Sequence, residues 1–110
     1  METKFSNVAS HEALQEIISD SFSRPVVVFK HSNRCGISSV AYREMQKLNG
    51  EVSVVDVNSS RNISEEFARV TGIKHESPQV IILRNGNAVW NASHYDVQAR
   101  AIKEAVDANG

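Results

Sequence analysis

Cys35 is the only cysteine in the chain, and it stands between a β-branched run and a stretch with helical periodicity. A thiol in this position precedes the first turn of a helix, where free amide groups and the helix dipole stabilise negative charge. The thiolate is the reactive form of cysteine, so this location favours a nucleophile. The alternative is that Cys35 is a small buried hydrophobic side chain, which is the usual fate of free cysteines.

Two neighbours of Cys35 have side chains that can assist a thiolate. Arg34 can add positive charge beside it, or can extend into solvent. Ser38 lies three residues further on, so on a helix its hydroxyl shares a face with position 35 and can donate to the thiolate. It can equally be an ordinary exposed serine. An oxygen atom cannot resolve a mixed disulfide, so resolution requires a second molecule.

The residues just before the cysteine loop supply further polar candidates. His31 can act as a general base or a proton source, or it can cap the loop as a structural side chain. Lys30 and Ser32 are weaker candidates for the same site. Asp56 lies in an otherwise apolar run, and we interpret it as structural. The other histidines are scattered, and with a single cysteine they form no recognisable metal site.

Periodicity predicts eight elements that position these residues, in the order α-β-α-β-α-β-β-α. A strand–helix–strand unit requires a parallel pair with a right-handed crossover, and the Asn85-Gly86 turn predicts an antiparallel hairpin. The fold class is therefore α/β, with a mixed four-stranded sheet flanked by helices. The predicted helices cover residues 10–22, 37–48, 63–71 and 96–108, and the predicted strands cover 26–29, 52–57, 79–84 and 87–92.

Several helix ends carry recognisable signals. Ser10 is a plausible N-cap for the first helix. Asn62 is the expected cap of the third helix, with Glu65 completing a capping box. Gly72 follows that helix, where a left-handed residue is favoured. Ser77-Pro78 precedes the hairpin, so it lies near Cys35 if the first hairpin strand pairs antiparallel with the 26–29 strand.

Bulk composition narrows the class of protein. The 110 residues have a formal net charge of -1, with 41% hydrophobic and 23% charged residues, and predict one soluble globular domain over residues 1–110. The basic residues are dispersed, which argues against nucleic acid or a membrane surface as the main partner. The N-terminus lacks the apolar segment of a signal peptide, so we expect a cytoplasmic protein.

The segment ARVTGIKHESPQVIILRNGNAV, residues 68–89, resembles the helix end, Gly-Ile step and cis-proline strand of the thioredoxin superfamily. Within that superfamily, His31-Ser32, Cys35 and Ile37-Ser38 are most similar to the monothiol bacilliredoxins of the bacillithiol system (YtxJ-type). Those relatives usually carry Thr-Cys-Pro where this chain has Arg-Cys-Gly. Gly36 leaves the loop less rigid than proline would.

The resemblance implies a thiol–disulfide oxidoreductase that removes bacillithiol from protein mixed disulfides through Cys35. It implies that Pro78 is cis and that the Ser77 backbone pairs with an extended substrate chain. Bacillithiol is then a co-substrate, S-bacillithiolated proteins are the partners, and a second thiol or a reductase regenerates the cysteine. No metal or tightly bound cofactor is implied.

Two other classes of function stay open. The sequence Cys-Gly-Ile-Ser is similar to the Cys-Gly-Phe-Ser signature of monothiol glutaredoxins, which carry iron–sulfur clusters. Against this reading, residues 91–94 lack the Gly-Gly turn with which those proteins hold glutathione. The remaining class is a redox-inactive thioredoxin-like binding module, in which Cys35 is inert.

Overall fold

The computed structural model describes residues 2–32 and 36–110, and gives residues 36–38 as backbone only. Its sheet has five strands, β1 (Lys4–Asn7), β2 (Val26–His31), β3 (Glu51–Asp56), β4 (Gln79–Arg84) and β5 (Asn87–Ser93). Its helices are α1 (His11–Asp20), α2 (Gly36–Met45), α3 (Arg61–Thr71), the short 3-10 helix η1 (His94–Asp96) and α4 (Ala99–Ala108).

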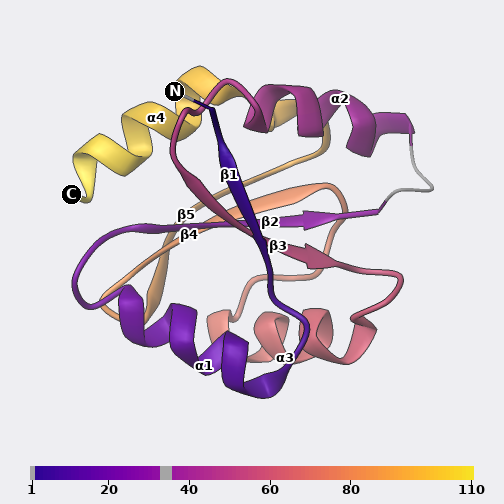
Figure 1. The fold of residues 1–110 in the computed structure, drawn as a ribbon, viewed down its shortest axis with the longest axis vertical. Coiled ribbons are helices and arrows are strands. Elements are labelled where there is room, and N and C mark those ends of the chain that lie inside the picture. Colours follow the sequence, from indigo (N-terminus) through magenta and orange to yellow (C-terminus); the bar gives the residue numbers. More distant parts are fainter. Residues whose placement is uncertain (1, 33–35) are drawn as a thin grey trace.

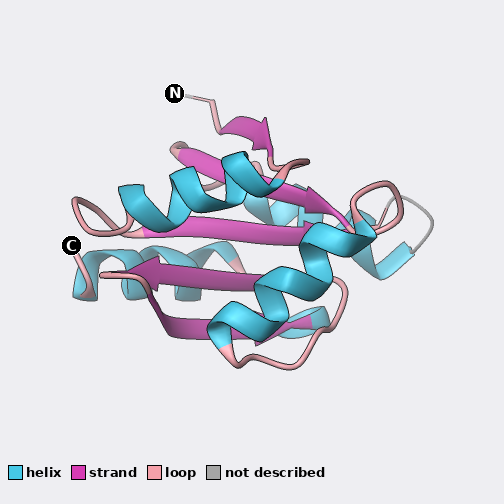
Figure 2. Ribbon diagram, turned by 90° about the horizontal axis from the view of Figure 1, so that it is seen from below, coloured by secondary structure: helices cyan, strands magenta, loops and turns pink. Residues whose placement is uncertain are grey.

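The strands are arranged in the order β1-β3-β2-β4-β5. β3 is parallel to β1 and β2, whereas β4 is antiparallel to β2 and β5. Helices α2 and α4 cover one face of this sheet and α1 and α3 cover the other (Figures 1 and 2). The molecule is therefore a three-layer α/β structure with the sheet in the middle. No helix among the described residues is long and apolar enough to cross a membrane.

Each face of the sheet carries its own hydrophobic core, because side chains alternate along a strand. From β2, Val27 and Phe29 face the α2–α4 core, whereas Val26 and Val28 face the α1–α3 core. Five of the six residues of β2 are buried, as is typical of a central strand covered on both sides.

The predicted α/β fold is confirmed, and the structure adds one strand to the four that were predicted. The extra strand, β1, is short and mostly exposed, and it pairs only with β3 at the edge of the sheet. Its sequence, KFSN, has no apolar alternation that would reveal it. Backbone bonds hold it in place, from Lys4 N to Gly50 O at 2.9 Å and from Val8 N to Val54 O at 2.8 Å.

Of the three helix-end signals that the sequence carries, two are confirmed and one is wrong. Ser10 caps α1 by accepting a hydrogen bond from Ala13 N at 3.1 Å, and Gly72 follows α3 with a φ of 72°. The predicted capping box at Asn62 is wrong, because α3 begins two residues earlier with Ser60 as its N-cap residue. Glu65 instead reaches Arg61, one turn back, at 3.3 Å.

The last helix also starts later than predicted, at Ala99 rather than Asp96, because η1 occupies the segment before it. The hairpin forms as predicted. Asn85 and Gly86 both have positive φ, as a two-residue type I′ turn requires.

At the turn end of this hairpin, Arg84 joins elements from both faces of the sheet. Its Nε donates to Asn109 O and its Nη1 to Ser21 O, both at 3.0 Å. Asn109 follows α4 and Ser21 follows α1. The turn adds a bond from Asn85 N to Ser21 O at 2.7 Å.

Candidate functional site

The candidate site lies at the edge of the sheet where β2 and β3 end and β4 begins. His31 and Asp56 are register partners at the ends of β2 and β3, and Lys30 is the register partner of Gln79 at the start of β4. Helix α2 starts at the same edge, at Gly36 (Figure 1). The topology thus brings together the predicted residues at the end of β2 and those before β4.

Cys35 and Arg34, which the sequence singles out, lie outside the described residues. Gly36 and Ser38 are described as backbone within α2. The predicted roles of these four residues therefore stay predictions. In the sequence, position 35 immediately precedes Gly36, the first residue of α2.

Asp56 organises the turn that follows β3, as its structural interpretation predicts. Its Oδ1 accepts hydrogen bonds from Asn58 N at 2.9 Å and Ser59 N at 3.3 Å. These bonds, the first of them above all, lower the pKa of the carboxyl group. Asn58 then donates from Nδ2 to Ser32 Oγ at 2.9 Å, so the turn holds the start of the cysteine loop.

The Ser77–Pro78 peptide bond is cis, as the resemblance implies. Pro78 O accepts a hydrogen bond from His94 N at 2.9 Å, which fixes the strand start against the residue that follows β5. The Ser77 hydroxyl oxygen is buried and has no hydrogen-bond partner among the described residues. The β4 strand does pair antiparallel with β2, so this step lies at the same edge as His31.

His31 packs between aromatic rings on the α2 side of the sheet. Its ring centroid lies 5.3 Å from that of Phe29 and 5.7 Å from that of Tyr42. Burial lowers the pKa of His31, and the nearby Asp56 carboxylate opposes that shift. The ring is therefore mainly neutral at pH 7, which favours a proton acceptor or a packing role over a proton source.

Lys30 is the residue that the sequence interpretation undervalued. Its side chain is fully buried on the α3 face, and its Nζ lies 6.0 Å from the centroid of the Phe67 ring. Nζ has no hydrogen-bond partner within residues 2–32 and 36–110. Burial lowers the pKa of this amine to about 8. The alternation of Val26, Val28 and Lys30 was a signal that could have placed this side chain in the core.

A polar pocket of about 650 Å³ lies beside the turn after β3. Ser64 and His75 form one wall, with Ser64 Oγ and His75 Nδ1 3.1 Å apart. The pKa of His75 is lowered, first by burial and then by the positive charge of Lys30. Within the described part of the chain, no three acidic, histidine or cysteine side chains gather as a metal site would require. The pocket is lined by Val57, Asn58, Arg61, Ser64, Glu65 and His75.

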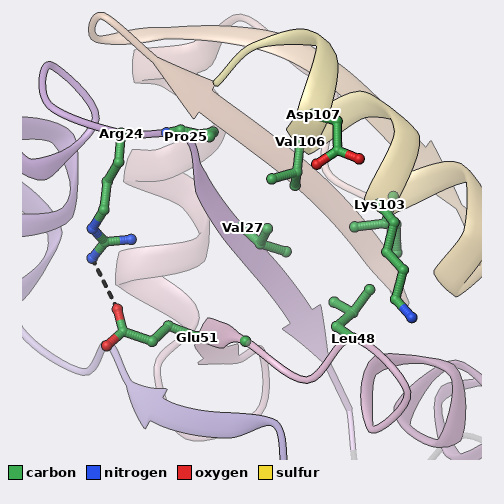
Figure 3. Close-up of a pocket in the computed structure, with 10 residues that line it drawn as sticks. Arg24, Pro25, Val27, Leu48, Glu51, Lys103, Val106 and Asp107 are labelled. Atoms are coloured by element: carbon green, nitrogen blue, oxygen red, sulfur yellow. Dashed lines mark ion pairs between the residues drawn. The ribbon is translucent and has the colours of Figure 1, made fainter. Parts of the chain in front are cut away.

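A second cavity, of about 380 Å³, lies at the opposite edge of the sheet (Figure 3). Its apolar wall includes Val27, Leu48 and Val106, and Arg24 at its rim pairs with Glu51 at 3.2 Å. None of the residues predicted for the site lines it, since the start of β2 is distant from the end that leads into the cysteine loop. We do not assign it a role in the chemistry.

The structure is similar to solved thioredoxin-fold proteins. A thioredoxin-fold protein assigned as an oxidoreductase superposes with a TM-score of 0.84 and 30% identity, with 92% of each chain covered. Thioredoxin from Fasciola hepatica is 16% identical with a TM-score of 0.74, over 94% of this chain and 98% of its own. Thioredoxin from Trypanosoma brucei brucei is 19% identical with a TM-score of 0.75, over 96% and 89%. The two thioredoxins support the fold alone.

A family model identifies the chain more narrowly. The model described as monothiol bacilliredoxin BrxC matches residues 6–102, a range that includes all the residues predicted for the site. The single cysteine agrees with the monothiol description. The chain therefore belongs to the monothiol bacilliredoxin family and is a thiol–disulfide oxidoreductase of the thioredoxin fold.

Proposed function

We propose that this protein removes bacillithiol from protein mixed disulfides, with Cys35 as the attacking thiolate. The observation that carries the proposal is the place of the only sulfur nucleophile, directly before α2 in a chain matched by the monothiol bacilliredoxin model. The first turn of α2 contains no acidic residue, so nothing there offsets the positive end of the helix dipole. That end favours the thiolate over the thiol.

In the first step, the Cys35 thiolate attacks the bacillithiol sulfur of the mixed disulfide. A new sulfur–sulfur bond joins bacillithiol to Cys35, and the protein sulfur leaves as a thiolate that takes a proton from water. A second thiol or a reductase thiol, again as thiolate, then attacks the bound bacillithiol sulfur and releases Cys35. The oxidising equivalent passes to that second thiol, so the cycle needs no metal.

In this proposal, other residues at the same edge of the sheet bind the substrate or adjust the loop that carries the thiol. The Ser77 backbone pairs with the extended chain of the modified protein, and His31 and Ser32 offer polar contacts to the low-molecular-weight thiol. Arg34, Gly36 and Ser38 tune the loop that carries the thiol. We propose that residues 1–110 act as one domain. We place the reaction in the cytoplasm, where reducing systems keep thiols free.

The test uses one target protein modified either with bacillithiol or with glutathione. Wild-type protein is expected to release bacillithiol at least about tenfold faster than glutathione, a rate ratio that corresponds to roughly 1.4 kcal/mol of transition-state preference. It should also carry one bacillithiol on Cys35 when mass is measured after quenching. The Cys35→Ser variant should release neither thiol.

Each contrary result points to a different conclusion. Equal rates on the two substrates would remove the bacillithiol assignment and leave a general monothiol oxidoreductase. No release of either thiol by wild-type protein would favour a redox-inactive binding module. Visible absorbance of protein reconstituted with iron and sulfide, lost in Cys35→Ser, would favour the iron–sulfur carrier.

A further inference from the structure

Lys30 is a cation that the fold buries without a compensating anion. Its side chain has 0% relative exposure, and it takes part in no ion pair among the described residues. Its Nζ lacks a hydrogen-bond partner there, and so does Oε1 of Gln79, its register partner on β4. Burial of an unpaired charge is costly. An anion that came close to this amine would therefore be bound favourably.

The surroundings of Lys30 direct its charge toward the polar pocket beside the turn after β3. Its Nζ lies 6.0 Å from the centroid of the Phe67 ring, and Ser64 lies three residues before Phe67, on the same face of α3. In the loop before β4, the positive charge of Lys30 contributes to the lowered pKa of His75. Ser64 and His75 form one wall of the pocket. These two relations place the ammonium group on the sheet side of that wall.

The pocket also gathers groups that suit an anion. Ser64 is 2% exposed, and its Oγ lies 3.1 Å from His75 Nδ1, so the hydroxyl and the imidazole form a paired set of polar atoms. Arg61, the first residue of α3, lines the same pocket. The first turn of α3 contains no acidic residue, so the positive end of the helix dipole adds to the charge of Arg61.

Among the described residues that line the pocket, Glu65 is the one acidic side chain. Its Oε1 lies 3.3 Å from Nε of Arg61, and the side chains of Arg61 and Glu65 are 85% and 59% exposed. An exposed ion pair of this kind contributes little to stability, because water screens it. An incoming anion can therefore take the place of Glu65 beside Arg61 at small cost.

We propose that this pocket is an oxyanion site that binds the phosphate group of a small molecule. The buried ammonium group of Lys30 supplies a fixed positive charge, Arg61 supplies a second one at the rim, and the Ser64–His75 pair supplies hydrogen bonds. A phosphate group has three strong acceptor oxygens, which suits groups that come from a strand, a helix and a loop. The volume of about 650 Å³ leaves room for the organic part of the ligand. The inference goes beyond thiol exchange and does not rest on it.

Phosphate binding should change the protonation of His75. Burial lowers the pKa of His75, and the charges of Lys30 and Arg61 lower it further, whereas Glu65 and Glu76 raise it. A phosphate dianion beside the imidazole favours the charged form, so the pKa of His75 should rise when the site is filled. An NMR titration of the His75 ring protons in the native protein, with and without phosphate, measures this change.

The first experiment compares thermal unfolding of the full-length protein in inorganic phosphate and in sodium chloride of the same ionic strength. At about ten times the dissociation constant, phosphate should raise the unfolding midpoint by about 5 °C. Succinate, a dicarboxylate, is expected to bind at least about fivefold more weakly, because each carboxylate presents two acceptor oxygens rather than three. Tighter binding of succinate than of phosphate would overturn the phosphate assignment.

Variants separate the site from the general stabilisation that phosphate gives to folded proteins. Lys30→Met should weaken phosphate binding by at least about tenfold, although in chloride it is expected to unfold at or above the wild-type temperature. Arg61→Met should also weaken binding, whereas Glu65→Gln should strengthen it by removing the competing carboxylate. Lys74→Met is the matched control, because it removes an exposed lysine that is not among the described lining residues. It should change the affinity by less than about twofold.

Two results would overturn the inference. Equal losses of affinity in Lys30→Met and Lys74→Met would show only a general attraction of anions to the surface. An unchanged pKa of His75 at saturating phosphate would place the anion elsewhere. If Lys30→Met does not fold, the opposite effects expected for Arg61→Met and Glu65→Gln decide the question together with the His75 titration. The proposed function is judged separately, by release of bacillithiol.

Discussion

Lys30 and His31 are neighbours in the sequence, yet β2 directs them to opposite faces of the sheet. Burial lowers the pKa of both side chains. With a pKa of about 8, Lys30 stays largely protonated at pH 7, whereas His31, which starts from a lower value, is mainly neutral. The two residues therefore have different electrostatic roles, although the sequence alone suggested His31 as the stronger candidate.

The buried amine should make the stability of the protein depend on pH. Lys30 titrates at about 8 in the folded chain and at 10.5 when unfolded. Below pH 8 it is protonated in both states, and burial of its charge lowers the free energy of unfolding by its full cost. Between these values the unfolded chain binds more protons, so the free energy of unfolding rises with pH; above 10.5 the cost is gone.

The Lys30→Met variant should lose this pH-dependent contribution to the free energy of unfolding. At pH 7 we expect the variant to exceed wild type in the free energy of unfolding by roughly 1–3 kcal/mol. The difference should shrink at pH 9.5, because the wild-type amine is then mostly neutral in the folded state. Urea unfolding at the two pH values measures it, with Lys74→Met as the exposed control. A difference that does not change with pH would contradict the proposed titration.

The sequence pointed to candidate site residues but not to the surroundings of each side chain. Cys35, with His31 and the Ser77–Pro78 step, could be named because each has a local motif. The environment of Lys30 could not be predicted in this way. The Phe67 ring that lies near the amine belongs to α3, which is distant in the sequence and approaches Lys30 only in the folded state. Burial of a polar side chain is a tertiary property, so propensity and spacing do not report it.

At the scale of the elements, the helix starts show that a local capping motif does not always set where a helix begins. Ser10 forms a capping bond, whereas Ser60 at the start of α3 forms none with its side chain. The capping-box pattern at Asn62 and Glu65 suggested another start. That predicted start is wrong because the backbone turn set by Asp56 leads directly into α3. In this turn, Ser60 N donates to Asp56 O at 2.8 Å. A turn fixed by tertiary structure overrode the local motif.

Two variants compare a residue that caps a helix with one that was predicted to do so but lies inside a helix. Ser10→Ala should lower the free energy of unfolding by about 1 kcal/mol, because Ala13 N loses its partner at the start of α1. Asn62→Ala, inside α3, should change it by less than about 0.5 kcal/mol. Chemical denaturation of both variants measures the two values. A comparable loss in Asn62→Ala would restore Asn62 as the cap.

Strand prediction succeeded where hydrophobic patterning was strong. β2 and β4 are central and buried on both faces, so their apolar runs were plain in the sequence. β1 was not predicted, because its stability comes from pairing with β3 rather than from its own composition. An edge strand of this kind forms only when the rest of the sheet is present to pair with it.

In the whole molecule, the site and Arg84 occupy opposite edges of the sheet. This separation predicts that stability and thiol chemistry can be altered independently. Arg84→Met removes two hydrogen bonds from partly buried carbonyl groups and should lower the free energy of unfolding by roughly 1–3 kcal/mol.

The pH midpoint for Cys35 alkylation should stay at its wild-type value in Arg84→Met. The control is Arg100→Met, which loses only an exposed pair with Glu104 and should cost less than about 1 kcal/mol. Denaturation and alkylation of the same preparations measure both properties. A shifted alkylation midpoint in Arg84→Met would mean that the two edges are coupled.

The Arg84 side chain also has a consequence for motion. Helices α1 and α4 cover opposite faces of the sheet, yet the segments that follow them, at Ser21 and Asn109, accept hydrogen bonds from one guanidinium group. Neither segment can detach without breaking a bond to the same strand residue. The two layers are thus joined into one cooperative unit for local opening, and amide protons at both helix ends should exchange with solvent at a common, slow rate.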